Sequence, residues 1–384
     1  MTKIKKRVVC FGAVTLFVLC LLPFICFSAS LTANAQNVGS SAECMALLET
    51  STNRVLYEKN AHVKRPMAST TKILTAIAVI ENTENLDTVR KIPDAAVGVE
   101  GSSIYLEKGE ELSVRDLLYG LMLQSGNDCA EALAILTAGD KTKFADLMNA
   151  TAQKIGAKDS HFVTPHGLHD DNHYTTAYDL ALITSYALKN PTFAEIVKTK
   201  KHTTPWHGRE YDRVIVNKNK LLNSFDGCDG VKTGYTKKAG RCFVSSATRD
   251  NMQVVCAVLN CGPMFEECAN KMEKAFSEYK MTEILAPLQK TGEISVENCR
   301  DENTDVGSLG PVTYPLKSGE KELLRIETTE LKKLKAPQKI GAEVGKIEIY
   351  LQNELLFEQK AFMIEDAKSK NVGDLLQEIV GEWT

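Results

Sequence analysis

The motifs of common metal sites are missing from the 384 residues of this chain. No C-x-x-C pair and no H-E-x-x-H occurs, and no histidine stands at a zinc-like spacing from a cysteine. Three histidines gather in "TPHGLHDDNHY" (residues 164–174), where a metal site is one interpretation and a hydrogen-bonded loop is the favoured one. We therefore expect neither a metal nor a cofactor.

Other common patterns are absent as well. There is no G-x-S-x-G, so a Ser-His-Asp triad of the hydrolase type has no support. Repeats and low-complexity segments are missing, and 43% apolar with 25% charged residues is the composition of a globular protein, long enough for two domains. An excess of positive charge is also lacking, since the net charge is −3, which argues against nucleic acid as a partner.

The first 35 residues have the pattern of an export signal. Four basic residues lie among the first seven, an apolar run follows from residue 8 to about 27, and residues 33–35 read Ala-Asn-Ala, an A-x-A cleavage site. We favour cleavage after Ala35 over an uncleaved membrane anchor, although the apolar run is long enough to span a bilayer. The removed segment carries +4, so cleavage leaves an exported chain with a net charge of −7.

Cysteine usage fits this interpretation without requiring disulfides. The chain has 11 cysteines, three of them within the signal, so eight remain after cleavage. Disulfides are possible in an exported protein. Most of the eight cysteines lie in apolar stretches, as Cys256 does in "VVCAVL", and buried free thiols are therefore favoured.

Hydrophobic periodicity predicts two domains. Residues 43–60 read as two strands around a polar turn, and β-rich runs return after Lys232 in "AGRCFVSSATRD" and "MQVVCAVLN". Helical patterns fill the middle, among them "VRDLLYGLML" behind a capping box at Ser113. This order predicts an α+β domain with an antiparallel sheet over residues 36–283. Short alternating runs with Gly and Pro turns predict a small all-β domain over 284–366, followed by a tail over 367–384.

A lysine beside an apolar helix suggests the chemistry. Residues 73–80 are apolar on nearly every side of a helix, so the helix that starts at Ser69 should be buried, yet Lys72 sits inside it, one turn after Ser69. Residues i and i+3 share a helix face. Burial lowers the pKa of a lysine, and a neutral amine can take the proton of a neighbouring hydroxyl. We therefore predict Ser69 as a nucleophile and Lys72 as its base.

Two further motifs strengthen this prediction. S-x-x-K alone is weak, because a snorkelling surface lysine also explains it. An S-x-N motif follows at residues 125–127 between two predicted helices, and K-T-G follows at residues 232–234 on an expected strand. In this order the three motifs form the signature of the serine penicillin-recognising enzymes.

The sequence resembles the low-molecular-mass penicillin-binding proteins, specifically the D-alanyl-D-alanine carboxypeptidases of serine peptidase family S11. "MASTTKILTA", "TPHGLHDDNHYTTAYDLALI" and "CDGVKTGYTKKAGRCFVSSATRD" carry the resemblance, which covers nearly the whole chain. It implies an α+β fold, namely a penicillin-recognising serine transpeptidase/β-lactamase-like domain with an antiparallel sheet flanked by helices, followed by a small all-β domain. It also implies removal of the terminal D-alanine from peptidoglycan stem pentapeptides ending in D-Ala-D-Ala, and covalent inhibition by β-lactam antibiotics.

The resemblance assigns the catalytic roles to three residues. Ser69 would attack the carbonyl between the last two D-alanines, with Lys72 as its base. Ser125 would relay a proton to the leaving amine, with the K-T-G lysine close to it. The backbone N–H of Ser69 would form one half of the oxyanion hole.

Five further positions would hold the substrate. Asn127 would bind its backbone, and Lys232 with Thr233 would bind its terminal carboxylate. Gly234 would leave room for the substrate along the strand. The backbone N–H of Tyr235 would complete the oxyanion hole.

Three alternatives stay open. A class A β-lactamase shares the motifs, but no E-x-x-x-N stretch lies between residues 127 and 232, and the extra β domain exceeds its usual extent. A wall endopeptidase or transpeptidase would use the same residues. The third alternative is a catalytically idle cell-wall scaffold, although all motif residues are intact.

The tail offers a possible peripheral membrane contact through residues 372–384. Five apolar residues fall on one helical face: Leu375, Leu376, Ile379, Val380 and Trp383. The polar side carries acidic residues and no basic ones, so packing against the β domain explains the pattern equally well. With the export signal, this predicts a protein of the cell wall or of the outer face of the cytoplasmic membrane.

Overall fold

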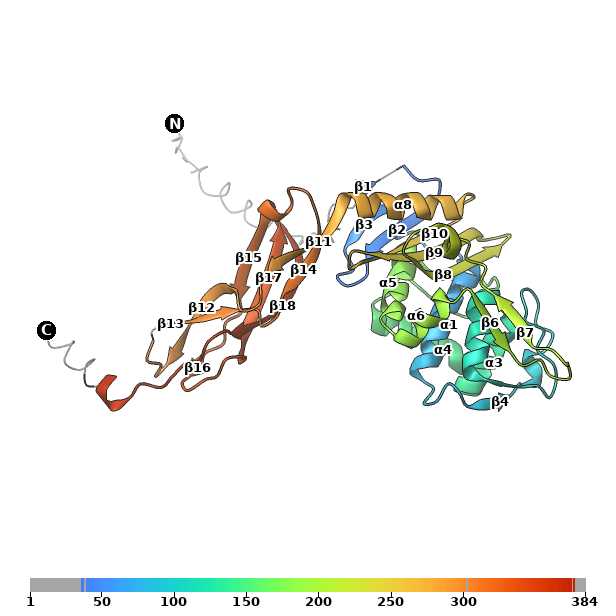
Figure 1. Ribbon diagram of the computed structural model, residues 1–384, viewed down its shortest axis with the longest axis horizontal. Helices are drawn as coiled ribbons and strands as arrows, with labels where there is room; N and C mark the ends of the chain where they lie inside the picture. Colours follow the sequence, from blue (N-terminus) through green and yellow to red (C-terminus); the bar gives the residue numbers. More distant parts are fainter. Residues whose placement is uncertain (1–35, 38, 302, 375, 377–384) are drawn as a thin grey trace, which may run out of the picture. The chain divides into compact units, whose positions relative to one another are not determined.

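The computed structural model describes residues 36–37, 39–301, 303–374 and 376, and Figure 1 traces them. The predicted signal peptide and nearly all of the predicted membrane-contact face lie outside these residues. Among the helices that are described, none has the length and apolar character needed to cross a membrane.

The N-terminal part of the described chain is built on a six-stranded sheet with the order β1-β3-β2-β10-β9-β8. Its strands are β1 (Gln36–Asn37), β2 (Cys44–Glu49), β3 (Val55–Lys59), β8 (Cys228–Thr236), β9 (Gly240–Arg249) and β10 (Met252–Leu259). β1 pairs with β3 in parallel, and the other neighbours are antiparallel. Strands from both ends of the region therefore meet in one sheet, as predicted.

Helices cover both faces of this sheet. Along β2, Met45 and Leu47 belong to the core under helix α8 (Met264–Glu278), whereas Ala46 and Leu48 belong to the core on the opposite face, which includes α5 (Ala177–Leu188). Successive strand residues point to opposite faces, so a strand covered on both sides reads as a continuous apolar run. Figure 1 shows α8 on one side of the sheet and α5 with α1 on the other.

The remaining helices lie between β3 and β8 in the chain. They are η1 (Ala68–Thr71), α1 (Lys72–Glu81), η2 (Asp94–Ala96), α2 (Val114–Tyr119), η3 (Gly120–Gln124), α3 (Asn127–Ala138), α4 (Lys141–Ile155), α6 (Pro191–Lys198) and α7 (Leu221–Ser224). The predicted cap of α2 is confirmed, because the Ser113 hydroxyl accepts the N–H of Asp116 at 3.0 Å. Two small hairpins, β4 (Val89–Lys91) with β5 (Glu111–Ser113) and β6 (Lys201–Thr204) with β7 (Arg213–Val216), complete this part.

The C-terminal part is all-β, as predicted. β11 (Tyr279–Leu285) pairs with β14 (Val312–Lys317). A second six-stranded sheet has the order β15-β17-β18-β13-β12-β16. Its strands are β12 (Lys290–Glu297), β13 (Asn303–Gly307), β15 (Leu324–Thr329), β16 (Leu334–Lys335), β17 (Glu343–Leu351) and β18 (Glu354–Met363). The short helix η4 (Lys321–Leu323) precedes β15.

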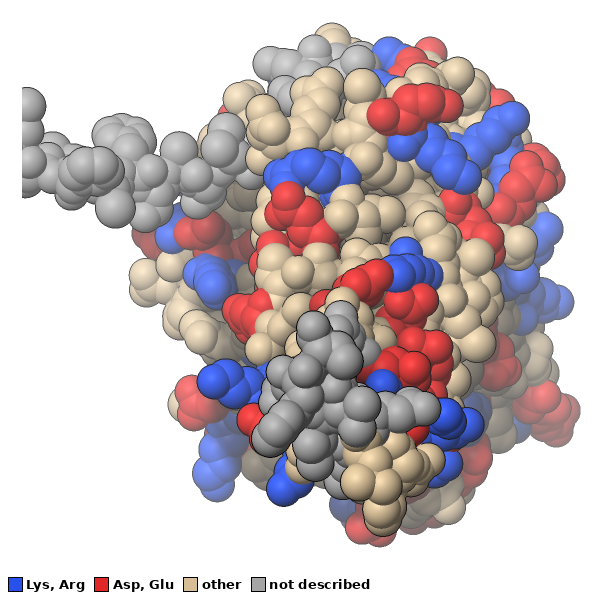
Figure 2. All heavy atoms as spheres, turned by 90° about the vertical axis from the view of Figure 1, so that its left-hand side faces the viewer, with Lys and Arg blue, Asp and Glu red and all other residues tan. Residues whose placement is uncertain are grey.

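This β-rich part has its own core and a mixed surface. Val344, Ile347 and Ile349 of β17 are buried in that core. Figure 2 shows Lys and Arg side chains interspersed with Asp and Glu over one face of the molecule. Residues of opposite charge also form ion pairs on this surface, as Glu343 does with both Lys332 and Lys360. Interspersed charges of both signs are typical of a solvated surface.

Candidate active site

Ser69 and Lys72 stand together where the chain enters its buried helix. Ser69 lies in the single 3-10 turn η1, and Lys72 is the first residue of α1. The Lys72 amine lies 3.1 Å from the Ser69 hydroxyl oxygen. The sequence predicted this pairing, but it placed both residues in one helix. Ser69 instead lies in a tighter 3-10 turn before α1, which apolar periodicity does not report.

Two other acceptors hold the Lys72 amine. The side-chain oxygen of Asn127 lies 2.7 Å from it, and the backbone carbonyl of His166 lies 2.9 Å from it. Burial lowers the pKa of this amine to about 7, from an ordinary value of 10.5. A substantial fraction of Lys72 is therefore neutral near neutral pH and able to accept a proton.

Ser125 lies at the junction of η3 and α3. Its backbone is left-handed, with φ of 67°, and it ends the π-turn that extends α2. The side chain is buried, but none of the hydrogen bonds among the described residues uses its hydroxyl. The next residue but one, Asn127, donates its amide to the carbonyl of Glu100 at 2.6 Å, so the loop near Gly101 supports the S-x-N segment.

Strand β8 brings the K-T-G motif against the backbone of Ser69. A Cβ on Gly234 would lie 3.0 Å from the backbone nitrogen of Ser69 and 3.1 Å from that of Thr70. The close approach of η1 to β8 therefore leaves little space for a side chain at Gly234, and the expected reason for this glycine, room for the substrate, stays a prediction. Tyr235, the next residue, is 65% exposed.

Lys232 is fully buried on the same strand. Its amine donates to the carbonyl of Thr233 at 2.9 Å, and the expected proximity of Lys232 to Ser125 stays a prediction. Burial, followed by the charges of Lys72 and Lys218, lowers the pKa of Lys232 well below its ordinary value. A buried amine of this kind gains most from an anionic partner.

Lys218 is a further basic residue that the sequence did not single out. It follows β7, and its amine lies 3.4 Å from the hydroxyl of Ser102. Lys218 is an exposed residue, but partial desolvation lowers the pKa of its amine, and its charge lowers the pKa of both Lys72 and Lys232. Within the described residues, none of the three amines pairs with a carboxylate, so the site is suited to an anionic ligand. No local motif marks Lys218, because only the fold brings it close to the other two lysines.

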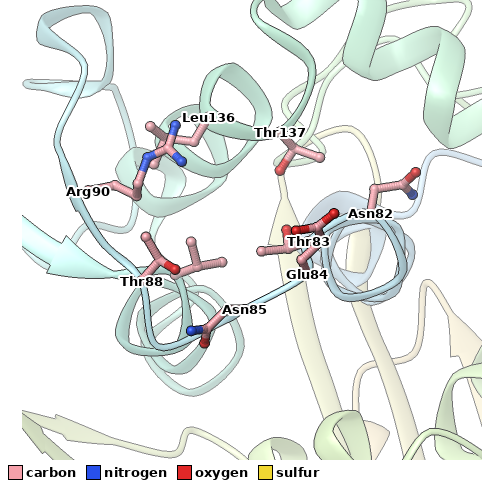
Figure 3. A pocket seen from close by; sticks show the side chains of 9 residues that line it. Asn82, Thr83, Glu84, Asn85, Thr88, Arg90, Leu136 and Thr137 are labelled. Atoms are coloured by element: carbon pink, nitrogen blue, oxygen red, sulfur yellow. The ribbon is translucent and has the colours of Figure 1, made fainter.

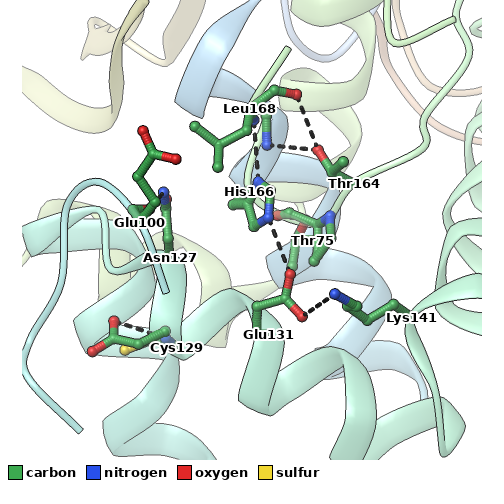
Figure 4. A network of polar contacts seen from close by, with 12 residues as sticks. Thr75, Glu100, Asn127, Cys129, Glu131, Lys141, Thr164, His166 and Leu168 are labelled. Atoms are coloured by element: carbon green, nitrogen blue, oxygen red, sulfur yellow. Dashed lines mark hydrogen bonds and ion pairs between the residues drawn. The ribbon is translucent and has the colours of Figure 1, made fainter. Parts of the chain in front are cut away.

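His166 also belongs to the surroundings of Lys72, although the sequence assigned it no role. Figure 4 shows its ring between Leu168 and Glu131, with Lys141 on the far side of Glu131. The Nε2 atom of His166 lies 3.1 Å from the Glu131 carboxylate, and its Nδ1 accepts the N–H of Leu168 at 3.1 Å. Burial lowers the pKa of His166, so the ring is neutral and donates from Nε2.

A separate cavity of about 260 Å³ lies at the other end of α1. Figure 3 shows that polar side chains such as Asn82, Glu84, Asn85 and Arg90 line it. None of the predicted site residues contributes to its lining. Because Lys72 begins α1 and Asn82 follows its last residue, about 15 Å of helix separates this cavity from the Ser69 hydroxyl.

Comparisons with known proteins match both the α+β part and the β-rich part of the chain. The family described as "D-alanyl-D-alanine carboxypeptidase" matches residues 31–262, and "Penicillin-binding protein 5, C-terminal domain" matches residues 279–369. The chain is 30% identical to D-alanyl-D-alanine carboxypeptidase DacF of Bacillus subtilis (strain 168), over 89% of this chain and 90% of that protein. It is 32% identical to D-alanyl-D-alanine carboxypeptidase DacA of Escherichia coli (strain K12), over 86% of this chain and 84% of that protein.

A solved structure shares the fold. The crystal structure of the D-alanyl-D-alanine carboxypeptidase DacD from Francisella tularensis superposes with a TM-score of 0.68 and 26% identity, over 88% of this chain and 97% of that one. These matches extend over both the α+β part and the β-rich part of the chain. The chain therefore belongs to the D-alanyl-D-alanine carboxypeptidase family of serine peptidases.

Proposed function

We propose that this protein removes the terminal D-alanine from peptidoglycan stem pentapeptides through an acyl-enzyme on Ser69. The observation that carries the proposal is the contact of 3.1 Å between the Ser69 hydroxyl and the buried Lys72 amine, whose pKa is about 7. A serine hydroxyl attacks a carbonyl only when a base takes its proton. Lys72 is the basic group that touches the hydroxyl.

Acylation would start with the neutral amine. Lys72 takes the Ser69 proton while the hydroxyl oxygen attacks the carbonyl carbon of the penultimate D-alanine. The resulting oxyanion would be stabilised by the backbone N–H groups of Ser69 and Tyr235. The close packing of Gly234 against the Ser69 backbone supports this assignment, because it holds β8 beside the nucleophile.

The terminal D-alanine then leaves as an amine. Ser125 is proposed to give its proton to the leaving nitrogen and to receive in return the proton that Lys72 took from Ser69, which leaves the Lys72 amine neutral again. Among the described hydrogen bonds, none engages the Ser125 hydroxyl and competes with this role. Water attacks the acyl-enzyme in the second half of the reaction, with Lys72 again as the base. Hydrolysis restores the Ser69 hydroxyl and releases the shortened stem peptide.

Substrate binding would use the unpaired positive charges. The terminal carboxylate of the substrate is proposed to bind Thr233 and Lys232, with Lys218 adding to the positive field. A carboxylate at this place would supply the counter-charge that the buried Lys232 amine lacks. Asn127, whose side-chain oxygen already accepts from Lys72, would orient the backbone of the stem peptide.

The same site would accept β-lactam antibiotics. Their strained amide and carboxylate match the groups that Ser69 and Lys232 are proposed to meet, and the acyl-enzyme should persist. Glu131 is a buried carboxylate four residues after Asn127, but its contacts are with His166 and Lys141 rather than with Ser69. Slow deacylation therefore separates the proposed enzyme from a class A β-lactamase, which uses a glutamate to activate water.

The proposed place of action is the cell wall or the outer face of the cytoplasmic membrane. The export pattern of residues 1–35 supports it, and residues 372–384 would add a weak peripheral contact with the membrane. The wall precursor that carries D-Ala-D-Ala is found on that side of the membrane.

Release of D-alanine tests the function directly. The mature protein is incubated with a stem pentapeptide ending in D-Ala-D-Ala, and free D-alanine is measured with time. We expect release by the wild type and none above background with Ser69→Ala. Rapid turnover of penicillin without release of D-alanine would instead identify a β-lactamase, and the absence of both would indicate a scaffold.

A further inference from the structure

Helix α3 reaches the Lys72 amine by two routes. Asn127, at its first turn, accepts directly from the amine at 2.7 Å. Glu131 lies one turn further along the same face and is buried. It accepts the Nε2–H of His166, and the backbone carbonyl of His166 accepts from the amine at 2.9 Å. Figure 4 shows the second route, from α3 through the imidazole.

The loop that carries His166 packs directly on η1, the nucleophile turn that carries Ser69. Gly167 has φ of +84°, and a Cβ there would lie 1.9 Å from the carbonyl oxygen of Ala68. The hydroxyl of Thr75 donates to the carbonyl of Pro165 at 2.7 Å, so two successive carbonyls of this loop face α1. A shift of the His166 ring would therefore move an acceptor of Lys72.

The direction of the Lys72 lone pair depends on these acceptors. A neutral amine has two N–H bonds and one lone pair. Asn127 and the His166 carbonyl take the two hydrogens, which leaves the lone pair for the Ser69 hydroxyl. If one acceptor moves, the amine can rotate, and proton transfer becomes slower even though the lysine stays in place.

We propose that Glu131 is a positioning residue of the acyl transfer: it holds His166 so that the His166 carbonyl orients the Lys72 amine toward Ser69. The inference rests on the proposed function. Glu131 touches neither Ser69 nor Lys72, and its two carboxylate oxygens face His166 at 3.1 Å and Lys141 at 3.3 Å. Lys141 is largely exposed and acts as a counter-ion of Glu131. The contact of Glu131 with His166 is therefore the one through which it would orient the Lys72 amine.

The experiment compares acylation by a fluorescent penicillin in four proteins. Glu131→Met keeps the length of the side chain but removes the acceptor, whereas Glu131→Gln keeps an oxygen that can accept from His166. Lys141→Ala is the matched control, because it removes the other contact of Glu131. We expect a loss in the acylation rate constant of about 10- to 100-fold for Glu131→Met, and of no more than about threefold for Glu131→Gln and Lys141→Ala.

Two readouts separate positioning from general damage. The non-covalent dissociation constant of penicillin should stay within about twofold in Glu131→Met, because only proton transfer is disturbed. A double-mutant cycle with His166→Ala should show no further loss from Glu131→Met, since the carboxylate acts through the ring. If Glu131→Met does not fold, as followed by thermal unfolding, Glu131→Ala takes its place.

The outcomes are distinct. If the wild type is acylated and Glu131→Met is acylated at the same rate, the inference is overturned and the proposed function stays intact. An undiminished effect of Glu131→Met in the His166→Ala background also overturns it, as does a Glu131→Gln variant as slow as Glu131→Met. A wild type that is not acylated and releases no D-alanine overturns the proposed function itself.

Discussion

At the scale of single residues, burial decides the protonation of Lys72. Because its pKa is lowered to about 7, the amine is protonated and inactive as a base at lower pH, and neutral and active at higher pH. The acylation rate constant should therefore rise about tenfold per pH unit below pH 7 and level off above it. Stopped-flow acylation over this range measures the midpoint.

A control variant uses the neighbouring charge. Lys218 lowers the pKa of Lys72, so Lys218→Met should raise the midpoint of the profile. A rate constant that does not change between about pH 6 and pH 8 would contradict the assignment of Lys72 as the base that is neutralised by burial.

Thr233 provides a second residue-scale prediction. Thr233→Val keeps the shape of the side chain and removes the hydroxyl proposed to donate to the terminal carboxylate. Hydrogen bonds to charged groups contribute about 1.5–3 kcal/mol, so kcat/KM for D-alanine release should fall by about 10- to 150-fold. The loss should nearly vanish for the same peptide with an amidated C-terminus. An equal loss on both peptides would show that Thr233 does not recognise the carboxylate.

At the scale of elements, the loop before α5 is fitted to the nucleophile turn. Gly167→Ala places a methyl group against the Ala68 carbonyl, whereas Gly139→Ala has nearly the same φ, +87° against +84°, and open space around its Cβ. Both variants carry the strain of a left-handed alanine, about 1–2 kcal/mol. Gly167→Ala should cost about 1–3 kcal/mol more, measured by denaturant unfolding. Equal destabilisation of the two variants would refute the close fit.

The elements also show what the sequence could and could not predict. The strands of the central sheet and the main helices were predictable, because apolar spacing differs between a strand and a helix. The β6–β7 hairpin was missed, since each of its strands has only four residues and β6 contains no apolar residue. The π-turn of η3 was also missed, because it interrupts hydrogen bonding without changing the apolar pattern.

The candidate site was predictable where residues are close in the chain or belong to a motif. Ser69 and Lys72 are close in the chain, and the S-x-N and K-T-G motifs identified the other candidate residues. Glu131 and Lys218 could not be found in this way, since each reaches the site only after the chain has folded. His166 was noticed in the sequence, but its backbone carbonyl, rather than its ring, contacts the amine.

At the scale of the whole molecule, the division of the chain into two domains between residues 283 and 284 stays a prediction, and β11 runs across this boundary.

The membrane contact of the tail also stays a prediction, because most of its apolar face lies outside the described residues. Deleting residues 371–384 should move the mature protein from the membrane fraction to the soluble fraction with D-alanine release unchanged. Sedimentation with liposomes checks this, and a full-length mature protein that stays in the supernatant would show that the tail is no anchor.

The most direct test of the account is the acylation of Ser69 in a Lys72→Ala variant. Mass spectrometry after timed exposure to penicillin gives both the site of the adduct and its rate of formation, with Ser69→Ala as the blank. The account predicts an adduct on Ser69 in the wild type and a rate lower by about 10³-fold or more in Lys72→Ala. Acylation of Lys72→Ala at a rate near that of the wild type, with the protein folded, would contradict it.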